Sequence, residues 1–179
     1  MKENCKEFIF VIGKSEGMNA EKMIEGINKI VDTQKTGKDE SIFTLVFFNE
    51  AYKFSASGKS FKEMKKYNKI TYVPKGKSAL WDAMGYSMDT VGERLSETSQ
   101  ENMPCQVCMI VIGESDNAST VYDFARLDEM IKVQKYTYKW DFVFYGDKES
   151  GFDINKGGKF ENYEAMFEAI NNYITSLRQ

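Results

Sequence analysis

The chain alternates short, continuously apolar stretches with longer stretches in which apolar residues recur every three or four positions. The continuous stretches cover residues 8–12, 42–48, 107–112 and 141–146. Runs of this length and character are typical of strands that are buried on both faces of a parallel sheet. The pattern therefore predicts four strands of a buried sheet.

The periodic stretches predict four amphipathic helices, because each places its apolar residues on one stripe. Each stretch also begins at residues that cap helices. Asn19 caps the first helix, Ser78 the second and Asn162 the last, while Thr120 and Asp123 form a capping box for the third.

One connection is too short to hold a helix. Residues 42–48 are followed after Asn49-Glu50-Ala51 by a second stretch, 52–56, in which aromatic and polar residues alternate. Such a spacing predicts an antiparallel hairpin whose second strand lies at an edge of the sheet and has one solvent-exposed face. Residues 148–160 leave open whether another short edge strand follows.

Apart from this hairpin, strands alternate with helices, so we expect an α/β fold with three layers, helix–sheet–helix. The sheet should be mainly parallel, with about six strands and one antiparallel edge strand, as in Rossmann-like doubly wound folds. A chain of 179 residues with 42% hydrophobic residues fits one domain over residues 1–179.

The composition excludes several classes of function. The chain has no histidine, which removes Ser-His-Asp and Cys-His catalysis and histidine-bound metals. A net charge of −3 argues against a general nucleic-acid or membrane-surface partner, because both need a basic face. No apolar stretch is long enough to span a bilayer, and the first residues are too charged for a signal peptide. Three cysteines fit a reducing, cytoplasmic location better than a disulfide framework.

Three loops form the leading candidate site. Gly13-Lys14-Ser15-Glu16-Gly17 follows the first strand, Gly113-Glu114-Ser115-Asp116 follows residues 107–112, and Gly76-Lys77-Ser78-Ala79-Leu80 opens a helix. The carboxyl ends of parallel strands meet at one edge of a sheet, where backbone N–H groups and helix dipoles converge on a ligand. We therefore expect these loops to lie together.

In the order of its elements and in Ser78-Ala79-Leu80-Trp81-Asp82-Ala83, the chain resembles a von Willebrand factor A domain. In that family, Asp-x-Ser-x-Ser ends the first strand, a Thr lies in Gly-x-Thr-x-Leu-x-Asp-Ala, and Asp-Gly ends the fourth strand. These residues make a metal-ion-dependent adhesion site, in which Mg²⁺ keeps one position open for a partner's carboxylate. The resemblance implies a three-layer protein-binding domain with its site at the loop edge.

The chain departs from this motif at its carboxylates. Ser15, Ser78 and Asp82 match, with Ser78 in the place of the Thr, whereas glycines replace the first Asp, the second Ser and the Asp of the fourth strand, at Gly13, Gly17 and Gly113. Mg²⁺ needs hard oxygen ligands and usually at least one carboxylate to offset its dehydration, which two hydroxyls do not supply.

Other charged residues flank the same loops. Glu16, Glu114 and Asp116 leave open whether a metal site is rebuilt, while Lys14 and Lys77 would oppose a cation. We expect no cofactor and no ordered Mg²⁺ at this position, which makes the chain a degenerate member of the family it resembles.

The first hypothesis is a non-catalytic module that binds a protein partner through these loops without a metal. Lys14, Lys77 and the lysine-rich residues 59–77 would contribute, although a plainly solvated surface is the simpler interpretation of that segment. Ser15 and Ser78 would donate hydrogen bonds or cap helices, and Asp82 would tie the loops together from the first turn of its helix. No nucleic acid and no membrane is expected as a partner.

The second hypothesis is a phosphate, nucleotide or other anion site on the loop from Gly13 to Gly17. Gly13-Lys14-Ser15 resembles the end of a Walker A loop, but Phe8 stands where that motif needs its first glycine. The third hypothesis, a hydrolase with Ser15 activated by Lys14, is the weakest, because adjacent loop residues rarely reach nucleophile–base geometry.

Overall fold

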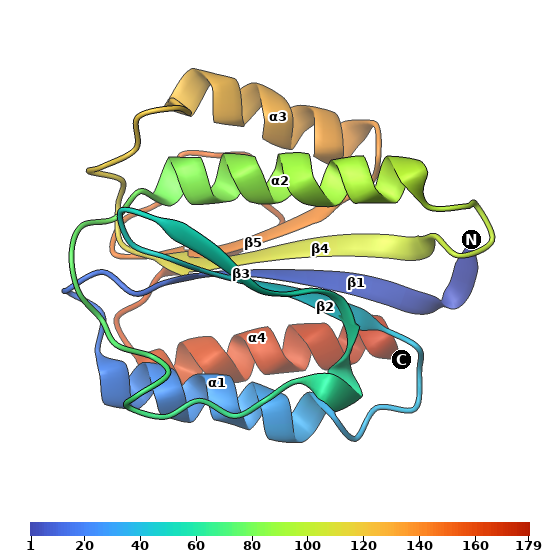
Figure 1. The fold of residues 1–179 in the computed structure, drawn as a ribbon, viewed down its shortest axis with the longest axis horizontal. Coiled ribbons are helices and arrows are strands. Elements are labelled where there is room, and N and C mark those ends of the chain that lie inside the picture. The colour runs from blue at the N-terminus through green and yellow to red at the C-terminus, as the bar shows by residue number, and fades with distance from the viewer.

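The computed structural model describes residues 1–179 and has a sheet between two layers of helices (Figure 1). The six strands lie in the order β3-β2-β1-β4-β5-β6, and only β3 is antiparallel to its neighbour. The strands are β1 (Lys2–Gly13), β2 (Ile42–Phe48), β3 (Tyr52–Ser60), β4 (Pro104–Gly113), β5 (Asp141–Gly146) and β6 (Lys156–Lys159). The expected three-layer α/β architecture with an antiparallel edge strand is confirmed.

Two helices cover each face of the sheet (Figure 1). The helices are α1 (Ala20–Gln34), α2 (Leu80–Glu97), α3 (Phe124–Tyr136) and α4 (Tyr163–Arg178), and a short 3-10 helix spans Phe61–Glu63. Along β1 the side chains alternate between the layers, with Phe8 and Phe10 packed on the α1 and α4 side and Ile9 on the α2 and α3 side. None of the helices combines the length and apolar character that a membrane span requires.

The ambiguous residues 148–160 contain β6, which pairs parallel to β5 at the edge opposite β3. Its sequence, Lys156-Gly157-Gly158-Lys159, has no apolar residue, so hydrophobic pattern could not predict it. Glycine is required at Gly157, where φ is +147° and a Cβ would lie 1.8 Å from the carbonyl oxygen of Phe144.

Two of the predicted helix caps are confirmed. The side chain of Asn19 accepts the backbone N–H of Lys22 at 3.0 Å, and that of Asn162 accepts the backbone N–H of Ala165 at 3.0 Å. Both helices therefore begin where the sequence predicts.

The other two cap predictions are wrong in part. The N-cap of α2 is Ala79, whose side chain cannot cap the helix. The Ser78 hydroxyl does not cap it either, because it donates to the backbone carbonyl of Glu114 at 3.0 Å. For α3 the cap is Asp123, but Thr120 lies outside the helix and donates its backbone N–H to Asp82 at 3.0 Å. In both cases a contact with a distant loop replaces the local cap.

The chain between β3 and α2 takes a long path around the molecule. Ser60 at the end of β3 pairs with Ile42 at the start of β2. From there, residues 64–79 run past α1 and rise to the loops that precede α2 (Figure 1). This segment therefore connects the two ends of the sheet.

Candidate functional site

The three predicted loops meet at the carboxyl ends of β1 and β4. Gly13 and Gly113 lie side by side there, and a Cβ on Gly13 would stand 3.1 Å from the Cα of Gly113. The ring of Phe48 closes the space next to them, because its Cζ atom would lie 2.8 Å from a Cβ on Gly113 and 3.3 Å from one on Gly13. The base of the loop edge is therefore tightly packed, and a larger side chain at either glycine would have to displace its neighbours.

Ser15, Ser78 and Glu114 come together above this base. The Ser15 hydroxyl donates to the carboxylate of Glu114, and the Ser78 hydroxyl donates to the backbone carbonyl of Glu114 at 3.0 Å. Both serines are 1% exposed. Both hydroxyls are thus inside the protein and link the loops to one another.

The carboxylate of Glu114 also covers Gly17. A Cβ on Gly17 would lie 1.9 Å from the Oε1 atom of Glu114, so any other residue at position 17 would displace this carboxylate. Glu16, by contrast, is exposed and forms no ion pair. Of the three acids that the sequence offered for a metal site, Glu114 alone accepts hydrogen bonds from the two serine hydroxyls.

Asp82 and Asp116 hold the loop after β4 against α2. The carboxylate of Asp82 accepts three backbone N–H groups, from Thr120 at 3.0 Å, Val121 at 3.0 Å and Tyr122 at 2.9 Å. The carboxylate of Asp116 accepts the backbone N–H of Trp81 at 3.1 Å and the hydroxyl of Ser119. Asp116 thereby caps α2 from another loop.

On its other side, the loop after β1 is joined to the segment that precedes α2. The N–H of Lys75 donates to the carbonyl of Lys14 at 2.8 Å, and the N–H of Glu16 donates to the carbonyl of Gly76 at 2.9 Å. The backbone N–H of Lys77 donates to the carboxylate of Glu50 at 2.9 Å. The side chains of Lys14 and Lys77 form no ion pair.

Tyr72 fixes the same segment from inside. Its hydroxyl donates to the carbonyl of Gly13 at 2.7 Å, and its ring is fully buried against Phe47. Burial, with smaller contributions from Tyr163 and Glu114, raises the pKa of the Tyr72 hydroxyl, so it stays protonated and remains a donor.

Hydrophobic pattern did not reveal a small pocket on the β5 side of the edge. Trp81 and Phe124 pack edge to face at 6.4 Å, and Phe124 stacks on Phe152 at 4.6 Å, around a pocket of about 180 Å³. Asp147 also lines this pocket and accepts both the backbone N–H of Ser115 at 2.6 Å and its hydroxyl at 2.8 Å. The position of Asp147, directly after β5, is the signal that could have added it to the candidate loops.

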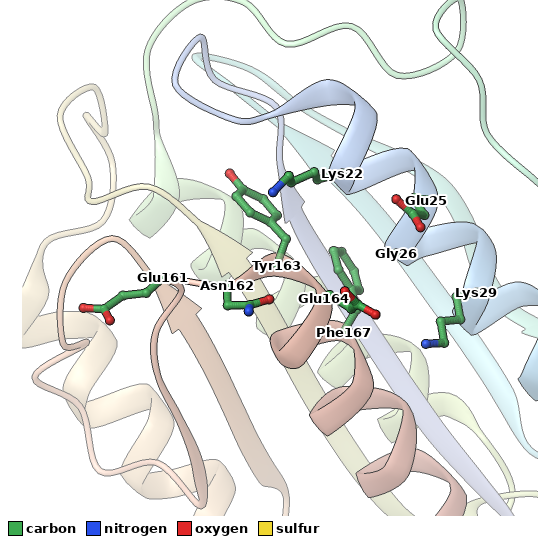
Figure 2. A pocket seen from close by; sticks show the side chains of 9 residues that line it. All are labelled: Lys22, Glu25, Gly26, Lys29, Glu161, Asn162, Tyr163, Glu164 and Phe167. Atoms are coloured by element: carbon green, nitrogen blue, oxygen red, sulfur yellow. The ribbon is translucent and has the colours of Figure 1, made fainter.

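Another pocket, of about 300 Å³, opens between α1 and α4 (Figure 2). Phe167 faces Gly26 there, and a Cβ on Gly26 would overlap the Phe167 ring, so this glycine allows the two helices to approach closely. The charged residues of the rim have both signs: Lys22, Lys29, Glu25, Glu161 and Glu164. The rim therefore does not present charge of a single sign.

Comparison with known proteins finds similar structures but no similar sequence. No family model and no curated sequence matches the chain. The solved structures that resemble it include proximal thread matrix protein 1 of the mussel byssus (TM-score 0.59, 15% identity, 98% of this chain and 46% of that one), a von Willebrand factor type A protein from Catenulispora acidiphila (0.58, 12%, 96% and 42%) and BatB from Bacteroides thetaiotaomicron (0.55, 14%, 95% and 97%).

The chain spans less than half the length of the first of these proteins. One structure of the mussel protein is described as having zinc in its metal-ion-dependent adhesion motif. At identities of 10–16% these matches show the fold alone. The order of the strands, the two helical layers and these matches together show that the chain has the von Willebrand factor A fold.

Proposed function

We propose that this chain is a non-catalytic, protein-binding module that engages its partner at the loop edge without a metal ion. The fold supports a binding role, since domains of this fold commonly mediate protein interactions. The observation that carries the metal-free part is the pair Gly13 and Gly113, which pack on each other and on the Phe48 ring.

The oxygen atoms of the edge do not fit the metal that the fold implies. A dehydrated Mg²⁺ needs about six oxygen ligands, usually including a carboxylate that is free to coordinate. Here the two glycines supply no carboxylate and are tightly packed, and Asp82 and Asp116 already accept hydrogen bonds from the chain. Glu114 is the one acid beside the serines, and no cluster of three acidic or cysteine side chains is present.

The anion-site alternative has less support. A phosphate loop needs several backbone N–H groups that point at the ligand. In the loop after β1, the N–H groups of Lys14, Glu16 and Met18 already donate within the protein, to Phe48, Gly76 and Ser15 respectively. The carboxylate of Glu114 lies against Gly17 in the same loop and would repel an anion.

Catalysis by Ser15 is also disfavoured. The side chain is 1% exposed, and its hydroxyl donates to Glu114 and not to Lys14. A nucleophile must reach both its base and a substrate, and Ser15 is closed off from solvent.

Charge reversal tests the proposal. The Lys14→Glu/Lys77→Glu variant should keep its thermal unfolding midpoint but capture at least about tenfold less partner from a lysate of the source cells, because both lysines flank the edge. The matched control is Lys35→Glu/Lys38→Glu, which reverses two exposed charges at the far end of α1. Equal capture by both variants would exclude the loop edge as the binding surface.

A further inference from the structure

Unpaired lysines recur along the segment that leads from the end of β3 to the loop edge. We call this set the lysine track: Lys59, Lys62, Lys65, Lys69, Lys75 and Lys77. Each of these side chains is exposed, and none forms an ion pair, although neighbouring Lys66 pairs with Asp32 at 2.8 Å. In a chain with a net charge of −3, such a set is a local concentration of positive charge that the fold itself does not neutralise.

Two apolar side chains project from the same segment. Ile70 is 87% exposed, the most of any large apolar residue in the chain, and Val73 is 47% exposed. Single exposed apolar residues are common, but here both lie between lysines of one short segment.

The segment is held in place by hydrogen bonds. The side chain of Asn28 on α1 donates to the carbonyl of Tyr67 at 2.9 Å and accepts its N–H at 2.8 Å. The side chain of Asn68 accepts the N–H groups of Ile70 at 2.8 Å and Thr71 at 3.1 Å. Together with the buried Tyr72, these contacts present Ile70 to solvent in a fixed position, which lowers the entropic cost of docking.

We propose that the lysine track is the docking surface for an extended acidic segment of a protein partner, with an apolar side chain of that segment packed on Ile70 and Val73. This inference rests on the proposed function, that the chain is a protein-binding module, and names the chemistry of its partner. Complementary charge would steer the acidic segment onto the track, and the apolar contact would slow its release.

The path of the track favours a polypeptide as the occupant. Lys59 pairs with Phe43 near the start of β2, and the N–H of Lys77 donates to Glu50 beyond the end of that strand. The two ends of the track are therefore separated by the length of a seven-residue strand, about 20 Å. The backbone segment that carries the track passes from the edge strand along α1 to the loop edge (Figure 1). An extended chain can follow this bend, whereas a flat lipid surface would meet only one part of it.

The test begins with the selection of random linear peptides, displayed on phage, against the intact protein. We expect the enriched peptides to be rich in Asp and Glu and to contain at least one large apolar residue. Binding of one such synthetic peptide should weaken about tenfold in Ile70→Ser and in Lys65→Glu/Lys69→Glu, and should weaken with added salt. Val133→Ser is the matched control, because Val133 is an apolar residue on α3 that is 51% exposed, and its binding should not change.

Enriched peptides without acidic residues, or binding that Ile70→Ser and the track variant leave unchanged, would overturn the inference. The inference would also be overturned if the selection enriched no acidic peptide and the wild-type protein sedimented with phosphatidylserine vesicles. If peptide binding is lost only in Lys14→Glu, which changes no lysine of the track, the loop edge remains the binding surface and the track alone is excluded. If it is lost only in the track variants, the track holds and the proposed loop edge fails.

Discussion

The acids of the loop edge and the lysines of the track, which ends at that edge, are used in opposite ways. Asp82, Glu114 and Asp116 accept hydrogen bonds from the chain itself and join three loops. The six lysines of the track project into solvent with no partner. The acids of the loop edge therefore stabilise the fold, whereas the lysines are free to bind the partner that we propose. The net charge of the chain does not show this division.

This division predicts that removing an acid should destabilise the protein much more than removing a lysine. The largest effect is expected for Asp82→Ala, which leaves three backbone N–H groups without their acceptor. The free energy of unfolding should fall by about 4 kcal/mol, measured by urea denaturation. Asp128→Ala is the control, because Asp128 pairs only with the exposed Lys132 on the same helix. Equal losses in the two variants would contradict a special role for Asp82.

Asp39 extends the same comparison to the opposite end of the molecule. Burial would raise the pKa of Asp39, but hydrogen bonds from the Arg178 guanidinium and the Ser41 hydroxyl lower it overall. The folded pKa is thus below the unfolded value, so this contribution to stability is complete above the unfolded pKa of about 4 and is lost as the pH falls through the folded pKa. Asp39→Asn should cost about 3 kcal/mol at neutral pH and progressively less below about pH 4. Urea denaturation over a pH series checks this, and a pH-independent difference would refute it.

Tyr72 is the residue that joins the two regions. Tyr72→Phe removes the donor to the Gly13 carbonyl and keeps the ring, so it should lower the free energy of unfolding by about 1.5 kcal/mol. Amide hydrogen exchange should increase in residues 68–77 and in the loop after β1, but not in α3. Unchanged exchange in both segments would show that the hydroxyl does not hold the track to the edge.

The smallest effect on stability is expected from the track itself. Lys65→Glu/Lys69→Glu should change the free energy of unfolding by less than about 0.5 kcal/mol, because these exposed side chains have no partner. Thermal unfolding followed by circular dichroism measures this. A larger loss would mean that the track stabilises the fold and would weaken the comparison.

Elements with a strong hydrophobic pattern were predictable from the sequence. The buried strands and the stripes of the helices follow directly from apolar spacing, and the caps Asn19 and Asn162 depend only on residues within their own turn. The glycine-rich β6 carries no such signal, since it pairs with β5 through its backbone alone.

The site was predictable only as a set of loops. Adjacent strand ends indicated that Ser15, Ser78 and Glu114 would approach one another, but the hydrogen bond between Ser15 and Glu114 joins residues 99 positions apart. The same distance in sequence explains the two wrong caps, because Ser78 and Thr120 bond to Glu114 and Asp82 in other parts of the chain. Local pattern cannot report which of several polar partners a side chain meets after folding.

The most direct test of the central claim, binding at the loop edge without a metal, uses a partner protein that the wild type captures and Lys14→Glu/Lys77→Glu does not. Its dissociation constant is measured by titration calorimetry with EDTA and with millimolar MgCl₂. Glycines at positions 13 and 113 supply none of the carboxylates that a cation needs, so we predict the same constant in both conditions. Binding that is lost in EDTA and restored by MgCl₂ would contradict the account.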